Sequence, residues 1–496
     1  MSGDGKRYRF GPLVRSGMFG QMPPAQLGLI VCGGLVSFVM LMARILPWAF
    51  IPFLVCAVVA FKQVRGRALH EVLAMRLRWF ARRKRRAWFR PIPLLGSDGI
   101  TPIALPPQLA GLELLEVDSP LTVTVGRRSG VAIIHDQSEG LVTVVLPVAG
   151  DGQFSLLSQG DQDHRVGLWG DALAGFCREA SPVVRITWHE WTTTAASSAH
   201  VSAATSTPPA GGPVEAAASV YRELLMVAAP AAVEREVLVA VTLKVALIRA
   251  RRSGSIPAIE SAIEVLLDEL RLFIGRLENA GLRPGAPLSP VEMVRAIRSR
   301  SNPGHVTPGS RSLASAVGVS TGDLTPMVVQ ETFTHCHVDG SVHRSWWVEG
   351  WPRLDVPAAW MDTLLLDGEQ TRTITVVFEP VPPSRAARGV DEAAVALEAA
   401  EASKSKHGFR IRAVDRRRRQ EVESREQELV SGYGDFIYAG FVHVTARSVD
   451  ALDEGGADIE QTAAHCGVQL RALDGRHGGG WVAGLPVGRT LARPAR

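Results

Sequence analysis

Two long apolar runs near the start of the chain dominate its hydropathy pattern. They cover Leu27–Met42 and Ile45–Phe61, and a dipeptide that contains Arg44 separates them. Each run is slightly shorter than the roughly 20 residues that span a bilayer as a helix, but flanking basic side chains extend the reach of such helices. Pro47, Pro52 and Arg44 argue against one continuous re-entrant or interfacial helix, which is the alternative interpretation. The pattern predicts an N-terminal two-helix transmembrane hairpin.

Beyond these runs, the apolar positions alternate between strand and helix periods. Predicted strands are Leu121–Val125, Val131–His135, Leu141–Val148, Val183–Trp191, Val237–Val245, Ser345–Glu349, Thr371–Glu379, Phe436–Ala446, Val468–Leu473 and Trp481–Leu485. Predicted helices cover residues 162–180, 259–280 and 449–466. Leu288-Ser289-Pro290 is typical of a serine-capped helix start, with proline at the first helical position. The fold class that we predict is a membrane-anchored α+β protein with mixed α/β cytoplasmic domains and a protruding helical hairpin.

Composition shifts divide the chain into segments. We predict a basic cytoplasmic N-terminus (1–24), the hairpin (25–62), a basic amphipathic juxtamembrane helix (63–95), an α+β domain (96–191), a linker or surface loop (192–213), a helix-rich region (214–330) and a second α+β domain (331–490) that contains the helical hairpin (390–430). The linker is rich in Ala, Ser, Thr, Pro and Gly. The sequence leaves open whether the part after the membrane hairpin is one domain or two.

Basic residues concentrate around the apolar runs. The first 95 residues contain 16 basic and two acidic residues, whereas the whole chain has a formal net charge of +5. Positive flanks on both outer sides predict a multi-pass protein of the cell (inner) membrane, with both termini in the cytoplasm. Residues expected at the membrane interface are Arg65, Arg67, Arg76, Arg78, Trp79, Arg82, Arg83, Lys84, Arg85 and Arg86. A stop-transfer flank that only sets topology is the alternative.

The motifs of common enzymes are missing from the sequence. No GxxxxGK[ST] or GxSxG sequence occurs, and Glu179, Glu190, Asp355 and Glu379 form no recognisable acid–base pair. Five cysteines are scattered without a CxxC pair, which indicates reduced thiols. We therefore predict a protein that is not an enzyme and has no cofactor.

His335-Cys336-His337 is the cluster that most resembles a metal site. Alternation on a strand would place both histidines on one face, with His343 nearby. Zinc normally needs three or four placed ligands. We therefore predict an edge-strand surface here and no metal site.

Two clusters are candidates for partner binding. The first is Trp346, Trp347 and Trp351, for which core packing is the alternative. The second is Arg416, Arg417, Arg418 and Arg419, which a nucleic acid or an acidic partner would bind. Acidic residues follow this run directly, so a salt-bridged, solvated helix is the favoured interpretation of it.

Specific residues at the N-terminus resemble a known subunit. Arg7-Tyr8-Arg9-Phe10-Gly11-Pro12-Leu13, the two apolar runs and Gly66-Arg67-Ala68-Leu69-His70-Glu71 look like the PrgI-type membrane hairpin subunit of type IV secretion systems. The resemblance extends over about 90 residues and includes the order of hairpin, Gly, Leu, Glu and basic helix.

Residues 330–488 resemble the N-terminal domain that precedes the motor in type IV secretion ATPases. The matching segments are Trp347-Val348-Glu349-Gly350-Trp351-Pro352, Val381-Pro382-Pro383-Ser384 and Gly484-Leu485-Pro486-Val487-Gly488. The motor has no counterpart in the sequence, so the resemblance implies a structural role. The combination resembles an uncharacterised family of actinobacterial integral membrane proteins from conjugation-like secretion clusters, and more weakly EccE of type VII secretion.

These resemblances imply a non-enzymatic inner-membrane scaffold of a type IV-like, conjugation-related secretion system that docks a separate cytoplasmic ATPase. The expected partners are the lipid bilayer, that ATPase, other membrane subunits of the machine and a second copy of the chain. Alternatives are a membrane-tethered DNA-binding module, for which nucleic acid is the partner, and a type VII secretion scaffold.

Overall fold

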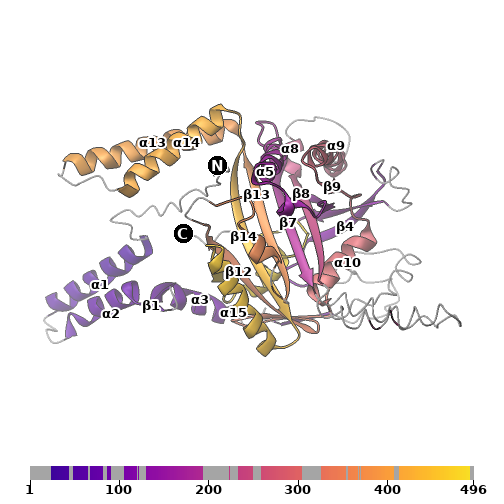
Figure 1. Cartoon of the computed structure of the whole chain (residues 1–496). Helices are drawn as coiled ribbons and strands as arrows, with labels where there is room; N and C mark the ends of the chain where they lie inside the picture. Colours follow the sequence, from indigo (N-terminus) through magenta and orange to yellow (C-terminus); the bar gives the residue numbers. More distant parts are fainter. Residues whose placement is uncertain are drawn as a thin grey trace, which may run out of the picture.

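The computed structural model describes residues 24–43, 48–64, 67–81, 87–90, 105–119, 121, 130–193, 220, 223, 233–249, 258–303, 325–352, 356–366, 368, 370–406 and 413–491. These residues form an α+β protein around one large antiparallel sheet. Two helical pairs project from the same side of the sheet (Figure 1). One pair comes from the start of the chain, and the other lies between two neighbouring strands of the sheet.

Thirteen strands of the described part belong to the main sheet. They are β3 (Ala87–Phe89), β4 (Leu112–Val117), β5 (Val131–Asp136), β6 (Leu141–Ala149), β7 (Val183–Thr193), β8 (Glu234–Lys244), β9 (Arg283–Pro284), β10 (Val328–Glu331), β11 (Cys336–Val338), β12 (Ser341–Gly350), β13 (Thr371–Val381), β14 (Asp435–Ala446) and β15 (Gln469–Ala472). The order across the sheet is β3-β10-β11-β12-β14-β13-β7-β8-β6-β5-β4, while β15 pairs with β12 and β9 with β6. A separate small sheet contains β1 (Gln63–Val64) and β2 (Arg67–Ala68).

The helices divide between the two halves of this sheet. In the first half they are η3 (Phe154–Leu156), α5 (Gln159–Ala174), α8 (Val245–Arg249), α9 (Ala258–Asn279) and α10 (Pro290–Ser301). In the second half they are α12 (Asp362–Leu366), α13 (Pro383–Lys406), α14 (Ala413–Val430), α15 (Val449–His465) and α16 (His477–Ala483). The predicted cap before α10 is confirmed, because Ser289 and Glu292 form a capping box with Pro290 in the first turn.

The two halves of the sheet repeat one plan. A first unit (residues 112–301) shares the order β4-β5-β6, α5, β7, β8, α9, β9 and α10 with a second unit (328–483), in which β10-β11-β12, α12, β13, β14, α15, β15 and α16 follow each other. In addition, η3 and α8 occur in the first unit, and the α13–α14 pair is inserted between β13 and β14 in the second. Exchanging the units leaves the strand order unchanged, and β7 pairs antiparallel with β13 at the centre. The sheet therefore has an approximate two-fold axis between β7 and β13.

The ends of the long helices confirm the correspondence between the units. After α9, Gly281 has a φ of 76° and Leu282 N donates to Leu277 O at 3.0 Å. After α15, Gly467 has a φ of 74° and Val468 N donates to Ala463 O at 2.8 Å. Glycine adopts this left-handed conformation without steric cost, and the two helices therefore end in the same type of glycine cap.

Helices cover both faces of the sheet. On one face, α5 and α9 pack on the first unit, and α12 and α15 pack on the second. On the other face, α10 and α16 share an apolar cluster with strands of both units. Fully buried residues such as Ile133, Leu238 and Phe273 lie in these layers. The core is thus continuous across the boundary between the units.

One predicted strand is wrong. Residues 481–485 do not extend the sheet, because α16 covers His477–Ala483. Gly480 lies against Ser345, and Gly484 lies against His443, so that a Cβ atom at either position would collide with the neighbouring side chain. The small residues allow this short helix to pack closely on the face of the sheet.

The predicted transmembrane hairpin is also wrong. The N-terminal segment forms α1 (Pro24–Met42) and α2 (Ile51–Phe61), which pack against each other. Within the described ranges, no helix combines the length and the apolarity that crossing a membrane requires. The second apolar run is not one helix, because α2 begins only at Ile51, with Pro52 in its first turn. At 1.5 Å per residue, its 11 residues extend about 16 Å, against roughly 30 Å for a hydrocarbon core.

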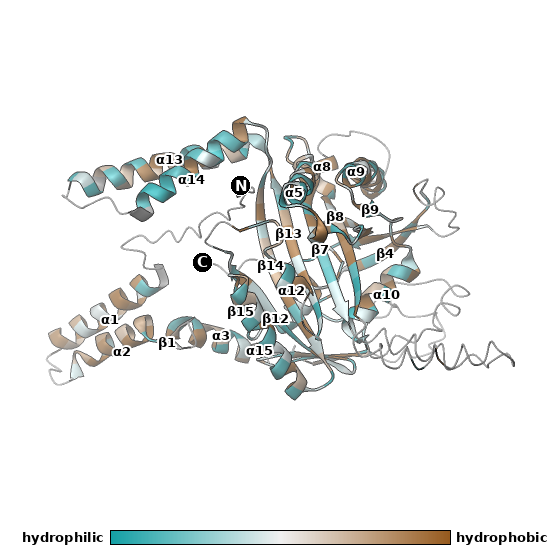
Figure 2. Cartoon of the chain, viewed as in Figure 1, coloured by the Kyte–Doolittle hydropathy of each residue, from teal (hydrophilic) through white to brown (hydrophobic). Residues whose placement is uncertain are grey.

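This finding overturns the membrane-anchored part of the predicted fold class. It equally contradicts the predicted multi-pass location in the inner membrane, and the cytoplasmic position assigned to both termini depended on that hairpin. Figure 2 shows that α1 and α2 are mainly hydrophobic, whereas α14 is mainly hydrophilic. The α+β character and the large antiparallel sheet are what the structure shows.

Candidate partner-binding surfaces

The N-terminal segment binds the second unit through α3 (Leu69–Ala81) and β3. Trp79 of α3 is 9% exposed and meets Phe333 edge to face, with ring centroids 6.1 Å apart. The guanidinium of Arg76 lies over the same Phe333 ring. Arg471 of β15 donates to Glu71 at 2.8 Å and to Glu349 at 3.1 Å. An aromatic contact and a shared ion pair therefore hold α3 against the second unit.

These contacts alter the interpretation of the predicted membrane-interface residues. Trp79 contacts protein, while Arg76 and Arg78 are exposed on α3 and Arg67 belongs to β2. The remaining members of the set lie outside the described residues: Arg65, Arg82, Arg83, Lys84, Arg85 and Arg86. Since the transmembrane hairpin is wrong, the argument that placed this segment at a bilayer no longer holds.

The tryptophan cluster belongs largely to the core. Trp346 is 1% exposed, and its Nε1 donates to Glu460 of α15 at 2.7 Å. Trp347 is buried on the opposite face of β12, near Phe441. Trp351 is half-buried and meets the rings of Trp360 and Tyr438 edge to face. Partner docking through these side chains stays a prediction, and Trp351 has the most surface available for it.

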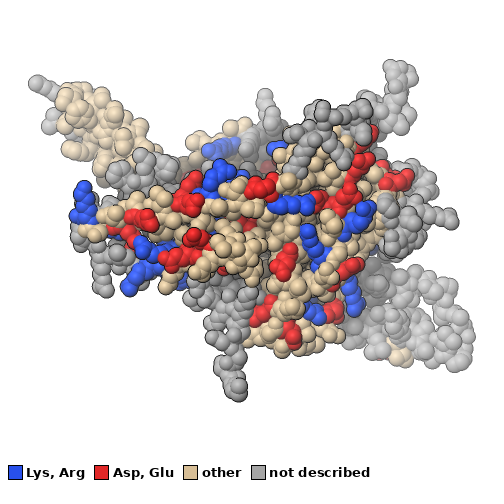
Figure 3. Space-filling view, turned by 90° about the horizontal axis from the view of Figure 1, so that it is seen from above, with Lys and Arg blue, Asp and Glu red and all other residues tan. Residues whose placement is uncertain are grey.

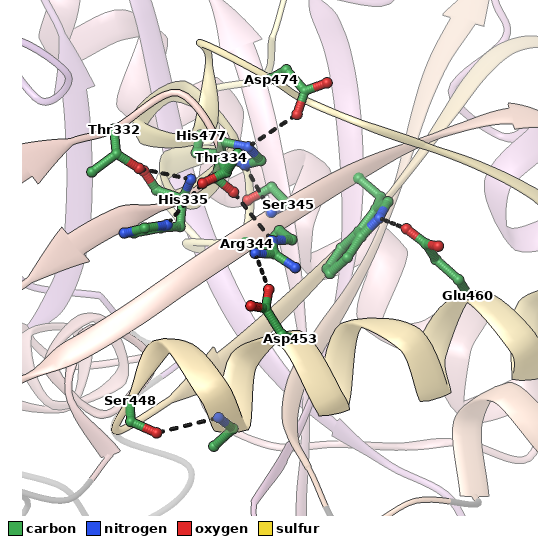
Figure 4. A network of polar contacts seen from close by, with 12 residues as sticks. Thr332, Thr334, His335, Arg344, Ser345, Ser448, Asp453, Glu460, Asp474 and His477 are labelled. Carbon is green, nitrogen blue, oxygen red and sulfur yellow. Dashed lines mark hydrogen bonds and ion pairs between the residues drawn. The ribbon is translucent and has the colours of Figure 1, made fainter. Parts of the chain in front are cut away.

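Buried polar contacts connect β12, β14 and α16. Figure 4 shows the part of this network that links Ser345 of β12 to His477 of α16. The backbone N–H of Ser345 donates to His477 Nδ1 at 3.2 Å, and its hydroxyl lies 2.9 Å from His443 Nδ1. His343 Nε2 donates to the Ser301 carbonyl at 2.8 Å. Burial lowers the pKa of His343 to about 4 and that of His443 to about 3. Both imidazoles are therefore neutral at neutral pH and act as hydrogen-bonding groups of the core.

The histidines of the His-Cys-His segment lie together, although His335 directly precedes β11 and only His337 belongs to it. His335 Nε2 and His337 Nε2 are 3.1 Å apart, whereas Cys336 is buried on the other face. His343 pairs with Cys336 in the register and points away from the two histidines. Among the described residues, no group of three or more His, Cys, Asp or Glu side chains is placed to hold a metal ion.

The predicted carboxylates lie at separate places. Glu179 accepts hydrogen bonds from the N–H and the hydroxyl of Ser384, which lower its pKa. Glu190 is 7% exposed, and burial raises its pKa to about 7 although Arg235 and Arg372 oppose the shift. Glu379 lies 3.5 Å from Arg185, and Asp355 lies outside the described residues. No two of the three described carboxylates share a site.

The α13–α14 pair carries the predicted arginine run and extends away from the sheet (Figure 1). Basic and acidic side chains both lie on the face of the molecule that is seen from above (Figure 3). Arg417 lies 3.4 Å from Glu421, and Arg419 forms an ion pair with Glu401 of α13. Arg416 is exposed and Arg418 is half-buried. Internal ion pairs therefore neutralise part of the run, as expected for a salt-bridged helix.

Comparison with known proteins assigns no family to the chain. No protein-family model matches it, and no functionally characterised protein matches its sequence. The secretion-system resemblance therefore stays a prediction from the quoted residues.

Sequence reasoning missed two features of these surfaces. The contact between Trp79 and Phe333 has no local signal, because the two residues are far apart in the sequence. The exposed face of α14 did have a local sequence signal, because its charged residues recur at helical spacing.

Proposed function

We propose that this chain is a non-catalytic assembly subunit of a type IV-like secretion machine and that it binds a separate secretion ATPase. The observation that carries the proposal is a direct contact between the two segments that resemble secretion proteins, which are the N-terminal segment and residues 330–488. The PrgI-like segment reaches the second unit, which is the part that resembles the domain preceding the ATPase motor. Under this proposal, one chain joins two kinds of module.

The contact between these segments is extensive. β3 is added to the edge of the sheet, with Trp88 opposite Val329 of β10. Arg90 N also donates to the Met327 carbonyl at 2.8 Å. Backbone pairing fixes the register of β3, while the Trp79–Phe333 contact fixes the helix that precedes it. Such a fixed contact suits a subunit that holds its partners in defined positions and does not catalyse a reaction.

Affinity purification of the tagged full-length chain from its own cells, at native expression, tests this proposal. We expect a hexameric secretion ATPase to be recovered in stoichiometric amounts, identified by mass spectrometry. A parallel purification with an unrelated tagged protein controls for non-specific recovery. Recovery of the chain without any secretion ATPase would contradict the proposal.

The alternatives predict different partners in the same purification. A DNA-binding module would retain nuclease-sensitive DNA, and its affinity would fall steeply with salt because phosphate binding releases counterions. A type VII scaffold would retain type VII subunits. The ion pairs of Arg417 and Arg419 reduce the charge available to DNA, so the assembly role is the one that we favour.

A further inference from the structure

One face of α14 carries an ordered sequence of exposed charges. Arg416, Arg419, Glu423 and Glu426 are separated by three, four and three residues, and all four are exposed. Residues at these spacings lie on the same side of a helix. Val430 continues the stripe and is 84% exposed. From the tip of the α13–α14 pair to its base at the sheet, the stripe therefore has two positive charges, two negative charges and an apolar residue.

Most of this stripe is not used within the chain. Arg419 forms an ion pair with Glu401 of α13. Arg416, Glu423 and Glu426 form no ion pair and no side-chain hydrogen bond with any other residue that the structure describes. Several other charges of the α13–α14 pair do form ion pairs, as Lys404 does with Asp415 at 2.7 Å and Arg417 with Glu421 at 3.4 Å. Three of the four charges of the stripe are therefore available to a second molecule.

The stripe is complementary to itself when reversed. In an antiparallel pair of α14 helices centred on residue 421, Arg416 lies opposite Glu426 of the second helix, and Arg419 lies opposite Glu423. Each of these pairs occurs twice, as in an isologous interface with two-fold symmetry. A parallel arrangement would instead place like charges opposite each other, which is unfavourable. The order of the charges thus selects one orientation.

We propose that two copies of this chain associate through antiparallel pairing of their α14 helices. The α13–α14 pair projects beyond the sheet (Figure 1), and the four charged side chains of the stripe are exposed. A second copy fits this surface better than a nucleic acid does, because Glu423 and Glu426 would repel phosphates along half of the stripe. The interface depends mainly on charge and is therefore sensitive to salt.

Charge reversal in the full-length chain, followed by analytical ultracentrifugation, tests this proposal. Arg416→Glu and Glu426→Arg each place two like-charged pairs in the dimer, and we expect at least a tenfold weaker association for either variant. A mixture of the two variants restores opposite charges at both positions and is expected to form a heterodimer. The double variant R416E/E426R restores them within one chain and is expected to dimerise as the unchanged protein does.

Glu428→Arg is the matched control. Glu428 is exposed on the opposite side of α14, and this substitution changes the net charge as Glu426→Arg does. We expect unchanged association for it. The proposal would be overturned by a chain that stays monomeric at every concentration, by equal effects of E426R and E428R, or by a mixture that does not restore dimers. None of these readouts depends on a secretion ATPase, so this proposal fails or holds separately from the proposed function.

Discussion

Replacing Trp79 with alanine should detach the N-terminal segment from the second unit. A buried tryptophan removes roughly 200 Å² from water, and at about 25 cal/mol per Å² this contributes up to about 5 kcal/mol. Measured losses for such truncations are about 3–5 kcal/mol. The Glu71–Arg471 ion pair contributes less, because Glu71 is 41% exposed at its side chain and exposed pairs contribute about 0–1 kcal/mol. The aromatic contact should therefore dominate.

Hydrogen exchange measures this difference locally. Opening of the segment exposes the amides of β3 and β10, whose pairing includes Gln330 opposite Ala87. A loss of about 3 kcal/mol corresponds to roughly a hundredfold faster exchange, whereas Glu71→Gln should change exchange less than about tenfold. Leu77→Ala is the control, because Leu77 is 69% exposed on the same helix. An effect of Glu71→Gln equal to that of Trp79→Ala would refute the reasoning.

Three further predictions concern the core. Gly480→Ala should destabilise the protein by about 1–3 kcal/mol in chemical denaturation, since its Cβ would meet Ser345. The free energy of unfolding should fall as the pH decreases from about 6.5 towards 3, because the unfolded chain binds protons that buried His443 and His343 do not bind in the folded protein. His443→Gln should make the free energy of unfolding less dependent on pH, and an unchanged pH dependence in this variant would contradict the prediction. Arg489→Met should cost about 3–5 kcal/mol, because it leaves the buried Asp136 carboxylate without the guanidinium 2.5 Å away, and Asp136→Asn in the same chain should recover part of the loss.

The strongest periodic segments could be predicted from the sequence. The helix at 258–279 and the strand at 435–446 closely match the predicted ranges, since their apolar periods are regular. The short strand β10 was not predicted, because four residues do not define a period. The repetition of one structural plan in the two units could not be predicted from the sequence. It lies in strand order and glycine caps rather than in repeated residues.

The errors share a physical cause. The apolar runs indicated length and hydropathy but not where a helix begins, and the structure starts α2 six residues after Ile45. The Trp481–Leu485 segment has the composition of a strand, yet the glycines around it allow a helix to approach the sheet. Tertiary packing decided both cases, and single-sequence patterns do not contain it.

Binding between purified components tests the central claim most directly. The full-length chain would be immobilised and titrated with a purified type IV secretion ATPase from the same cells, and with an unrelated hexameric ATPase as the control. The account predicts saturable binding of the secretion ATPase alone. Equal binding of both ATPases, or no binding by a chain with an intact unfolding transition, would contradict it.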